Sequence, residues 1–152
     1  MKKSIRLYAA LGLLAFVIGT SGSDVFASMT IGGERFGPAV GEHFYWAGRE
    51  LVGTGSLLLP FAILAVIGCW VEERSSRLKG LLTFGLPALY LIYRYFEGYH
   101  ASKLFELDHR WTAATLSVGF LPFVAAPIVV AAWVVGFVLI RFGRQRAEGG
   151  ID

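Results

Sequence analysis

Four apolar stretches separated by short polar segments dominate the pattern of this chain. A helix needs about 20 predominantly apolar residues to cross the hydrocarbon core of a bilayer, and each stretch approaches or exceeds this length. The pattern therefore predicts an all-α integral membrane protein, a single domain over residues 1–152 that forms a four-helix transmembrane bundle. The expected spans are residues 5–22, 48–71, 80–98 and 116–140, with outer loops at 23–47 and 99–115 and an inner loop at 72–79.

The first stretch has two interpretations. A basic start, an apolar core and the sequence Val25-Phe26-Ala27 are together typical of a signal peptide that is cleaved after Ala27. Alternatively, the stretch is a retained helix whose small-residue stripe packs against a neighbouring span. That stripe consists of Tyr8, Gly12, Ala15 and Gly19. We favour the retained helix, and in both cases the segment after residue 22 lies outside.

The outer loop between the first two spans contains a turn signal. Ser28–Ile31 and Arg35-Phe36 flank Gly32-Gly33-Glu34, a pattern that predicts a small hairpin or a compact turn. The second helix is expected to begin before the membrane, near Gly41. One face of that helix should carry His43, Trp46, Glu50 and Thr54, which recur three or four residues apart.

The fourth stretch is too long for one straight crossing. Residues 112–140 would extend about 43 Å as a helix, against a hydrocarbon core of about 30 Å. Pro122 and Pro127 lie within it and predict an adjustment of the helix. We therefore expect a short outer helix over residues 111–118, followed by a kinked crossing.

The distribution of basic residues predicts the orientation. Cytoplasmic segments of membrane proteins keep an excess of lysine and arginine. Nine basic residues flank the expected inner ends of the spans: Lys2, Lys3, Arg6, Arg74, Arg77, Lys79, Arg141, Arg144 and Arg146. The outer loops hold four, namely Arg35, Arg49, Lys103 and Arg110. Both termini should therefore be cytoplasmic, in an N-in/C-in arrangement in a bacterial inner membrane.

Composition narrows the function classes. Hydrophobic residues make up 55% of the chain, which favours a membrane protein over a soluble domain of this length. The net charge of +3 follows from the cytoplasmic flanks, and no basic arm with interleaved aromatic residues suggests nucleic acid. Cys69 is the only cysteine, so an internal disulfide is impossible.

The histidines provide one candidate site. His43, His100 and His109 are all expected on the outer side, and Glu97 precedes His100 by three residues. Four-helix bundles use this Glu-x-x-His spacing to bind two metal ions, although such sites use two copies of the unit and this chain has one. Metal or haem ligation by His43, Glu97, His100 and His109 therefore competes with a solvated rim of local ion pairs, and with a pH-sensing role for the histidines.

A stripe on the third span provides the second candidate. Tyr90, Tyr93, Arg94 and Glu97 share a helical face, and Arg94 can pair with Glu97 at a spacing of three. Together with Trp46, these residues are candidate contacts for a polar headgroup, an anionic ligand or a partner. The competing interpretation is an aromatic belt with an arginine that reaches the headgroup water.

No catalytic motif accompanies these candidates. The sequence lacks a Ser/His/Asp pattern, a glycine-rich phosphate loop and a Cys-x-x-Cys unit. We therefore expect a non-enzymatic accessory protein that binds a partner or lipid through its outer, periplasmic face, with no cofactor. The expected partners are the lipid bilayer and another membrane protein. The alternatives are a metal- or haem-binding membrane protein and a small oligomeric transporter, which would need a polar path through the bundle.

Overall fold

The computed structural model describes the backbone of residues 2–148 and the side chains of residues 3–142. Every regular element in this part of the chain is a helix, so the all-α prediction is confirmed. The elements are α1 (Lys2–Val17), the π-helix η1 (Ile18–Gly22), α2 (Ser23–Thr30), α3 (Phe36–Arg49), α4 (Leu51–Arg74), α5 (Arg77–Leu107), α6 (Trp111–Gly119) and α7 (Leu121–Glu148).

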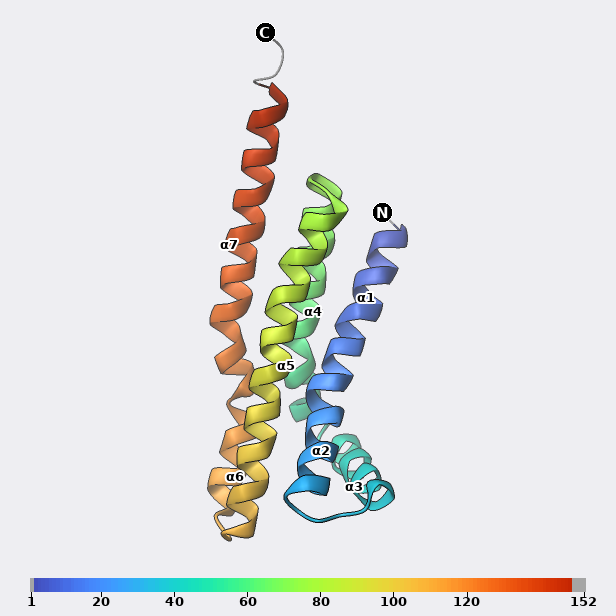
Figure 1. Ribbon diagram of the computed structural model, residues 1–152, viewed down its shortest axis with the longest axis vertical. Coiled ribbons are helices and arrows are strands. Elements are labelled where there is room, and N and C mark those ends of the chain that lie inside the picture. Colours follow the sequence, from blue (N-terminus) through green and yellow to red (C-terminus); the bar gives the residue numbers. More distant parts are fainter. Residues whose placement is uncertain (1, 149–152) are drawn as a thin grey trace.

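The long helices α1, α4, α5 and α7 form the body of the molecule (Figure 1). The beginning of α1, the turn between α4 and α5, and the end of α7 lie at the upper end of the view. The short helices α2, α3 and α6 gather at the opposite end. We call this the α3 end of the bundle. The basic clusters of the sequence are therefore separated from α3 by the length of the bundle.

Three helical segments within residues 3–142 are long and apolar enough to cross a membrane. They are Lys3–Thr30, Leu51–Arg74 and Trp111–Phe142, with mean hydropathies of 1.6, 2.1 and 2.7. Only about a third of each apolar window is buried inside the protein: 33%, 33% and 28%. The apolar side chains that remain exposed match the lipid-facing surface of a membrane helix rather than the surface of a soluble bundle.

The small-residue stripe of the first helix packs as predicted. Tyr8 and Ala15 are buried, and a Cβ atom at Gly12 would lie 3.1 Å from the Cβ of Ala65 on α4. A Cβ at Gly19 would lie 3.1 Å from the ring of Phe61, also on α4. Small residues let helix backbones approach closely, and dispersion contacts stabilise helix pairs inside a bilayer. The α1–α4 contact therefore depends on this stripe.

Of the two alternatives predicted for this segment, the hairpin is wrong, because its flanks are helical, whereas a compact turn does form around Gly32-Gly33-Glu34. Residues 23–30 form α2 and residues 36–49 form α3, with a turn of five residues between them. The helix persists to Thr30, whose hydroxyl donates to the carbonyl of Phe26, and the ring of Phe26 packs 5.5 Å from that of Phe96 on α5. A helix that docks on α5 satisfies its own backbone, whereas an isolated hairpin is marginal in water.

The other expected loops are also mostly helical. The segment 72–79 is broken only around Ser75 and Ser76, where the Ser76 hydroxyl accepts a hydrogen bond from the Lys79 amide and caps α5. In the segment 99–115, α5 continues to Leu107 and α6 begins at Trp111. The break in the fourth stretch is confirmed, because α6 ends at Gly119 and α7 starts at Leu121. Pro122 cannot donate an amide hydrogen, so it suits the start of a new helix.

Candidate functional site

A cavity of about 540 Å³ opens at the α3 end of the bundle, between η1, α2, α3, α4, α5 and α6. Its inner wall is apolar, because Phe16, Leu57 and Val118 also pack against the hydrophobic core. Its remaining lining is rich in charged and hydroxyl side chains. The charged members are Asp24, Glu42, Glu50, Lys103 and Glu106, together with His43. The cavity is therefore amphipathic, with an apolar floor and a polar mouth.

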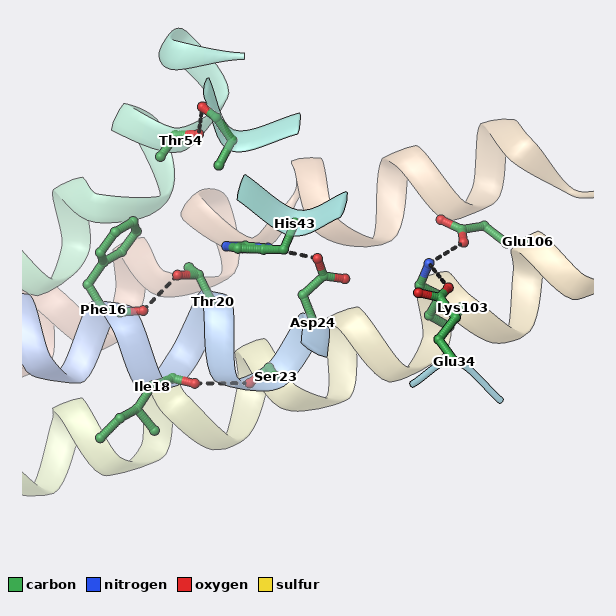
Figure 2. Close-up of polar contacts among 11 residues, drawn as sticks. Phe16, Ile18, Thr20, Ser23, Asp24, Glu34, His43, Thr54, Lys103 and Glu106 are labelled. Atoms are coloured by element: carbon green, nitrogen blue, oxygen red, sulfur yellow. Dashed lines mark hydrogen bonds and ion pairs between the residues drawn. The ribbon is translucent and has the colours of Figure 1, made fainter. Parts of the chain in front are cut away.

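The π-helix η1 contributes to one wall. An i→i+5 turn inserts an extra residue, so the helix face after it is rotated relative to the face before it. The hydroxyl of Thr20 in η1 donates to the carbonyl of Phe16 at 2.8 Å (Figure 2). The hydroxyl of Ser23, the first residue of α2, donates to the carbonyl of Ile18 at 3.5 Å. Four residues after Thr20, Asp24 lines the cavity as well. Such π-turns are frequent at functional sites.

Asp24 and His43 connect α2 with α3 at the mouth of the cavity. The Nδ1 atom of His43 lies 2.8 Å from the Oδ2 atom of Asp24 (Figure 2). The side chain of His43 is only 11% exposed and that of Asp24 is 23% exposed. A contact between partly buried polar groups is less screened by solvent than a surface ion pair. This contact holds α3, in which Ala39 is the one buried residue, against the bundle.

Lys103 forms a second polar centre on the opposite wall. Its Nζ atom lies 3.0 Å from Glu106 and 4.0 Å from Glu34, which precedes α3 (Figure 2). Burial by itself lowers the pKa of Lys103, but the hydrogen bond to Glu106 and the attraction of Glu106, Asp24 and Glu42 raise the pKa above its ordinary value. Lys103 is therefore a stable cation whose charge is already matched by neighbouring carboxylates.

The face predicted for the second helix is divided between two helices. Glu50 interrupts the helix with φ −108° and ψ 57°, so His43 and Trp46 lie on α3 and Thr54 lies on α4. The hydroxyl of Thr54 donates to the carbonyl of Ala47 at 3.1 Å and closes this bend. All four residues of the predicted face nevertheless line the cavity. Trp46 is half exposed there.

The tyrosine stripe of α5 lies elsewhere. Tyr93 donates to Glu97 at 2.5 Å, and Arg94 donates to the other carboxylate oxygen of Glu97 at 2.6 Å. The predicted Arg94–Glu97 pair therefore forms. However, Tyr90 and Tyr93 are 51% and 53% exposed, and neither these tyrosines nor Arg94 and Glu97 line the cavity. Of the predicted ligand contacts, only Trp46 does so.

The three histidines share the α3 end of the bundle but have different surroundings. His43 pairs with Asp24, His100 stacks on Phe96, and His109 is exposed in the turn after α5, where it has φ 57°. Glu97 pairs with Arg94. Within the described residues, no three His, Cys, Asp or Glu side chains are placed to hold one metal ion. His43 and Glu97 therefore have separate ion-pair partners, and the structure does not bring His43, Glu97, His100 and His109 together.

Several cavity residues were missed by the sequence interpretation. Tyr99 and Ser102 are buried on α5, and the hydroxyl of Ser102 donates to the carbonyl of Ala114 on α6 at 3.1 Å. The spacing of Lys103 and Glu106 predicts their ion pair, as it does for Arg94 and Glu97. Asp24 carries no comparable signal, because its partner is on another helix.

Comparisons of the chain with protein-family models, curated protein sequences and solved structures found no match.

Proposed function

We propose that this chain is a bacterial inner-membrane protein that crosses the bilayer four times and binds a small ligand or lipid headgroup in the cavity at the α3 end. It acts as a binding or accessory protein rather than an enzyme. The observation that carries the proposal is the amphipathic cavity, whose apolar floor and charged mouth suit a ligand located at a membrane–water boundary.

The fourth span of the proposal is α5. This helix has 31 residues and lies between the apolar helices, in contact with α4 and α7. Its buried residues include Phe84, Leu91 and Tyr95, and the hydroxyl of Tyr95 donates to the carbonyl of Leu57 on α4. Polar groups that face the interior of a bundle are compatible with a span, because neighbouring helices supply their partners. Within the expected span of residues 80–98, the Arg94–Glu97 pair lies near the outer end, where arginine can reach headgroup water.

The orientation follows from the basic residues. The start of α1, the α4–α5 turn and the end of α7 carry the excess of lysine and arginine, and they lie at one end of the bundle (Figure 1). We infer that this end is cytoplasmic and that the cavity opens to the periplasm. We also propose that residues 1–27 are retained rather than cleaved as a signal peptide. Tyr8 fills the space beside Gly68 and Gly80, and Ala27, at the possible cleavage site, is fully buried within α2.

A pair of glycines on α4 provides a direct test of cavity binding. Gly53 lines the cavity, and the first atoms that an added side chain would meet belong to Glu50 at 3.7 Å. Gly55 does not line the cavity, and a Cβ there meets nothing within 4 Å. Gly53→Trp should therefore fill the cavity, while Gly55→Trp adds the same group outside it.

The experiment is native mass spectrometry of each protein after mild extraction from the membrane in which it is expressed. The wild type and Gly55→Trp should both carry a bound species, and Gly53→Trp should have lost it. Circular dichroism and size-exclusion chromatography confirm that the variants are folded. If Gly53→Trp and Gly55→Trp retain the same species in the same amount, or if the wild type carries none, the cavity is not the binding site.

A further inference from the structure

An open groove of about 650 Å³ runs between α1 and α4. Its volume is within the range of about 300–1,000 Å³ that is typical of ligand pockets. Small residues on both helices make room for it, namely Ala9 and Gly12 on α1 and Ala62 and Ala65 on α4. Among the described residues that line it, Glu73 is the one charged side chain. The groove is therefore suited to a hydrocarbon chain.

The groove extends along the bundle from its basic end. It begins at Ile5 and Glu73, near the start of α1 and the α4–α5 turn, which lie together at the upper end of Figure 1. Its lining on α4 reaches from Leu58 to Glu73, about 22 Å of helix at 1.5 Å per residue. One leaflet of a hydrocarbon core of about 30 Å is about 15 Å deep. The groove therefore covers the depth of one leaflet, as the acyl chain of a lipid does.

Positive charge is in excess where the groove opens. Residues 3–6 and 72–79 contain five basic side chains against the two carboxylates of Glu72 and Glu73. Glu72 accepts a hydrogen bond from the hydroxyl of Ser4 at 2.8 Å. The basic side chains form no ion pair with any residue whose side chain is described. They are Lys3, Arg6, Arg74, Arg77 and Lys79. This end of the groove therefore attracts an anion.

Two of these arginines border the groove. The guanidinium of Arg74 lies over the ring of Trp70, 5.4 Å from its centroid, and Trp70 lines the groove. Arg6 shares a helical face with Leu13, seven residues later, which also lines the groove. Arginine binds phosphate through two parallel N–H···O hydrogen bonds. Arg6 and Arg74 are therefore positioned to hold a phosphate at the basic end.

From these observations we infer that the groove binds an anionic phospholipid. One acyl chain lies along the small residues of α1 and α4, and the phosphate is bound by Arg6 and Arg74. Basic pockets between transmembrane helices bind anionic lipid headgroups in the same way. A zwitterionic lipid is disfavoured, because its ammonium group would lie beside the arginines. The site is at the opposite end from the cavity of the proposed function and does not depend on the ligand of that cavity.

Native mass spectrometry of the full chain in a neutral detergent measures the binding of single lipids. Phosphatidylglycerol and phosphatidylcholine with identical acyl chains are titrated separately, so that the two lipids differ only in their headgroups. The apparent affinity for phosphatidylglycerol should be at least tenfold higher. Equal affinities for the two lipids would overturn the inference, because an apolar groove without an anion site binds either lipid.

Neighbouring alanines on α1 test the location of the lipid. Ala9 lines the groove, whereas Ala10 is exposed and does not line it. Ala9→Trp should weaken phosphatidylglycerol binding at least tenfold, and Ala10→Trp should leave it unchanged. Ala62→Trp fills the groove from α4 and should have the same effect as Ala9→Trp. Circular dichroism confirms that each variant is folded. Binding that neither Ala9→Trp nor Ala62→Trp weakens would overturn the inference.

Arginine variants identify the groups that bind the phosphate. Arg6→Gln and Arg74→Gln should each weaken phosphatidylglycerol binding about fivefold, the size typical of one basic residue near an anionic headgroup. Arg141→Gln is the matched control, because Arg141 is an exposed arginine on α7, outside the lining of the groove. An equal loss in Arg141→Gln would show a general attraction of the positively charged chain and contradict the inference.

The same spectra distinguish two other outcomes. If a second copy of the chain occupies the groove, a dimer should be present that Ala9→Trp dissociates, without any preference for phosphatidylglycerol, and the inference is then overturned. Gly53→Trp, at the α3 end, should leave phosphatidylglycerol binding unchanged. Loss of the lipid in Gly53→Trp together with its retention in Ala9→Trp would place it in the other cavity. That result would overturn this inference and leave the proposed function intact.

Discussion

Replacing Gly80 with alanine tests the packing that joins α1, α4 and α5. A Cβ atom at this position would lie 2.5 Å from the hydroxyl of Tyr8, 2.7 Å from the carbonyl oxygen of Gly68 and 2.8 Å from the Cβ of Glu72. The carbonyl of Gly68 is backbone and cannot rotate away. The added methyl group must therefore push α4 and α5 apart or displace Tyr8, which is 1% exposed.

The expected cost can be isolated with a second glycine on the same helix. Overpacking by one methyl group costs roughly 1–3 kcal/mol, and a glycine-to-alanine change within a helix gains about 0.5–1 kcal/mol. Gly85→Ala obtains this gain without a clash, because a Cβ there meets nothing within 4 Å. Both variants obtain the same gain from replacing a helical glycine, so this gain cancels when their free energies of unfolding are subtracted. Gly80→Ala should therefore be about 1–3 kcal/mol less stable than Gly85→Ala.

The assay is reversible unfolding of each purified variant in mixed micelles, followed by circular dichroism. Tyr8→Phe in the Gly80→Ala background should recover part of the loss, since it removes one of the three crowded atoms. If Gly80→Ala and Gly85→Ala differ by less than about 0.5 kcal/mol, a size that distant and independent surface changes also produce, the close contact of α1 with the α4–α5 pair is refuted.

Three further predictions concern the α3 end. Ser102→Ala should lower the free energy of unfolding by about 1 kcal/mol, because it leaves a carbonyl of α6 without its buried donor, whereas Thr115→Ala, at an exposed hydroxyl on α6, should have little effect in the same assay. Asp24→Ala should accelerate proteolysis of α3 by releasing its histidine partner, and the exposed Asp108→Ala should leave the cleavage rate unchanged. The pKa of Lys103 is raised by folding, so its stabilising contribution is complete below the ordinary lysine pKa of 10.5 and is lost as the pH rises through the higher folded-state value. Lys103→Met should remove this alkaline component from a plot of stability against pH, and an unchanged plot would contradict the assignment.

The sequence was most informative where residues close in the chain determine the structure. The stripe of Tyr8, Gly12 and Ala15 predicted a packed helix face because helical periodicity brings these residues together. The Arg94–Glu97 ion pair followed from a spacing of three for the same reason. The break before Pro122 could also be predicted, since a 43 Å helix exceeds the hydrocarbon core by about 13 Å.

The cavity depended on contacts that periodicity does not encode. Asp24 meets His43 only because α2 and α3 fold back on each other through a five-residue turn. The glycine pair predicted a hairpin or a compact turn at this point, but not the two helices that the turn connects. Helical spacing placed Tyr90 and Glu97 on one face but could not tell which face α5 turns toward its neighbours. The buried side of α5 carries Leu91, Tyr95, Tyr99 and Ser102 instead.

The central claim is that the cavity opens on the outer side of the membrane and holds a ligand. It is tested most directly by the reactivity of a cysteine at Ser56, an exposed position in the lining of the cavity. Ser56→Cys in a Cys69→Ala background should react with a membrane-impermeant maleimide in intact cells, and Gly53→Trp, which fills the cavity, should slow the reaction. Labelling that requires permeabilised cells, or a rate that Gly53→Trp does not change, would contradict the account.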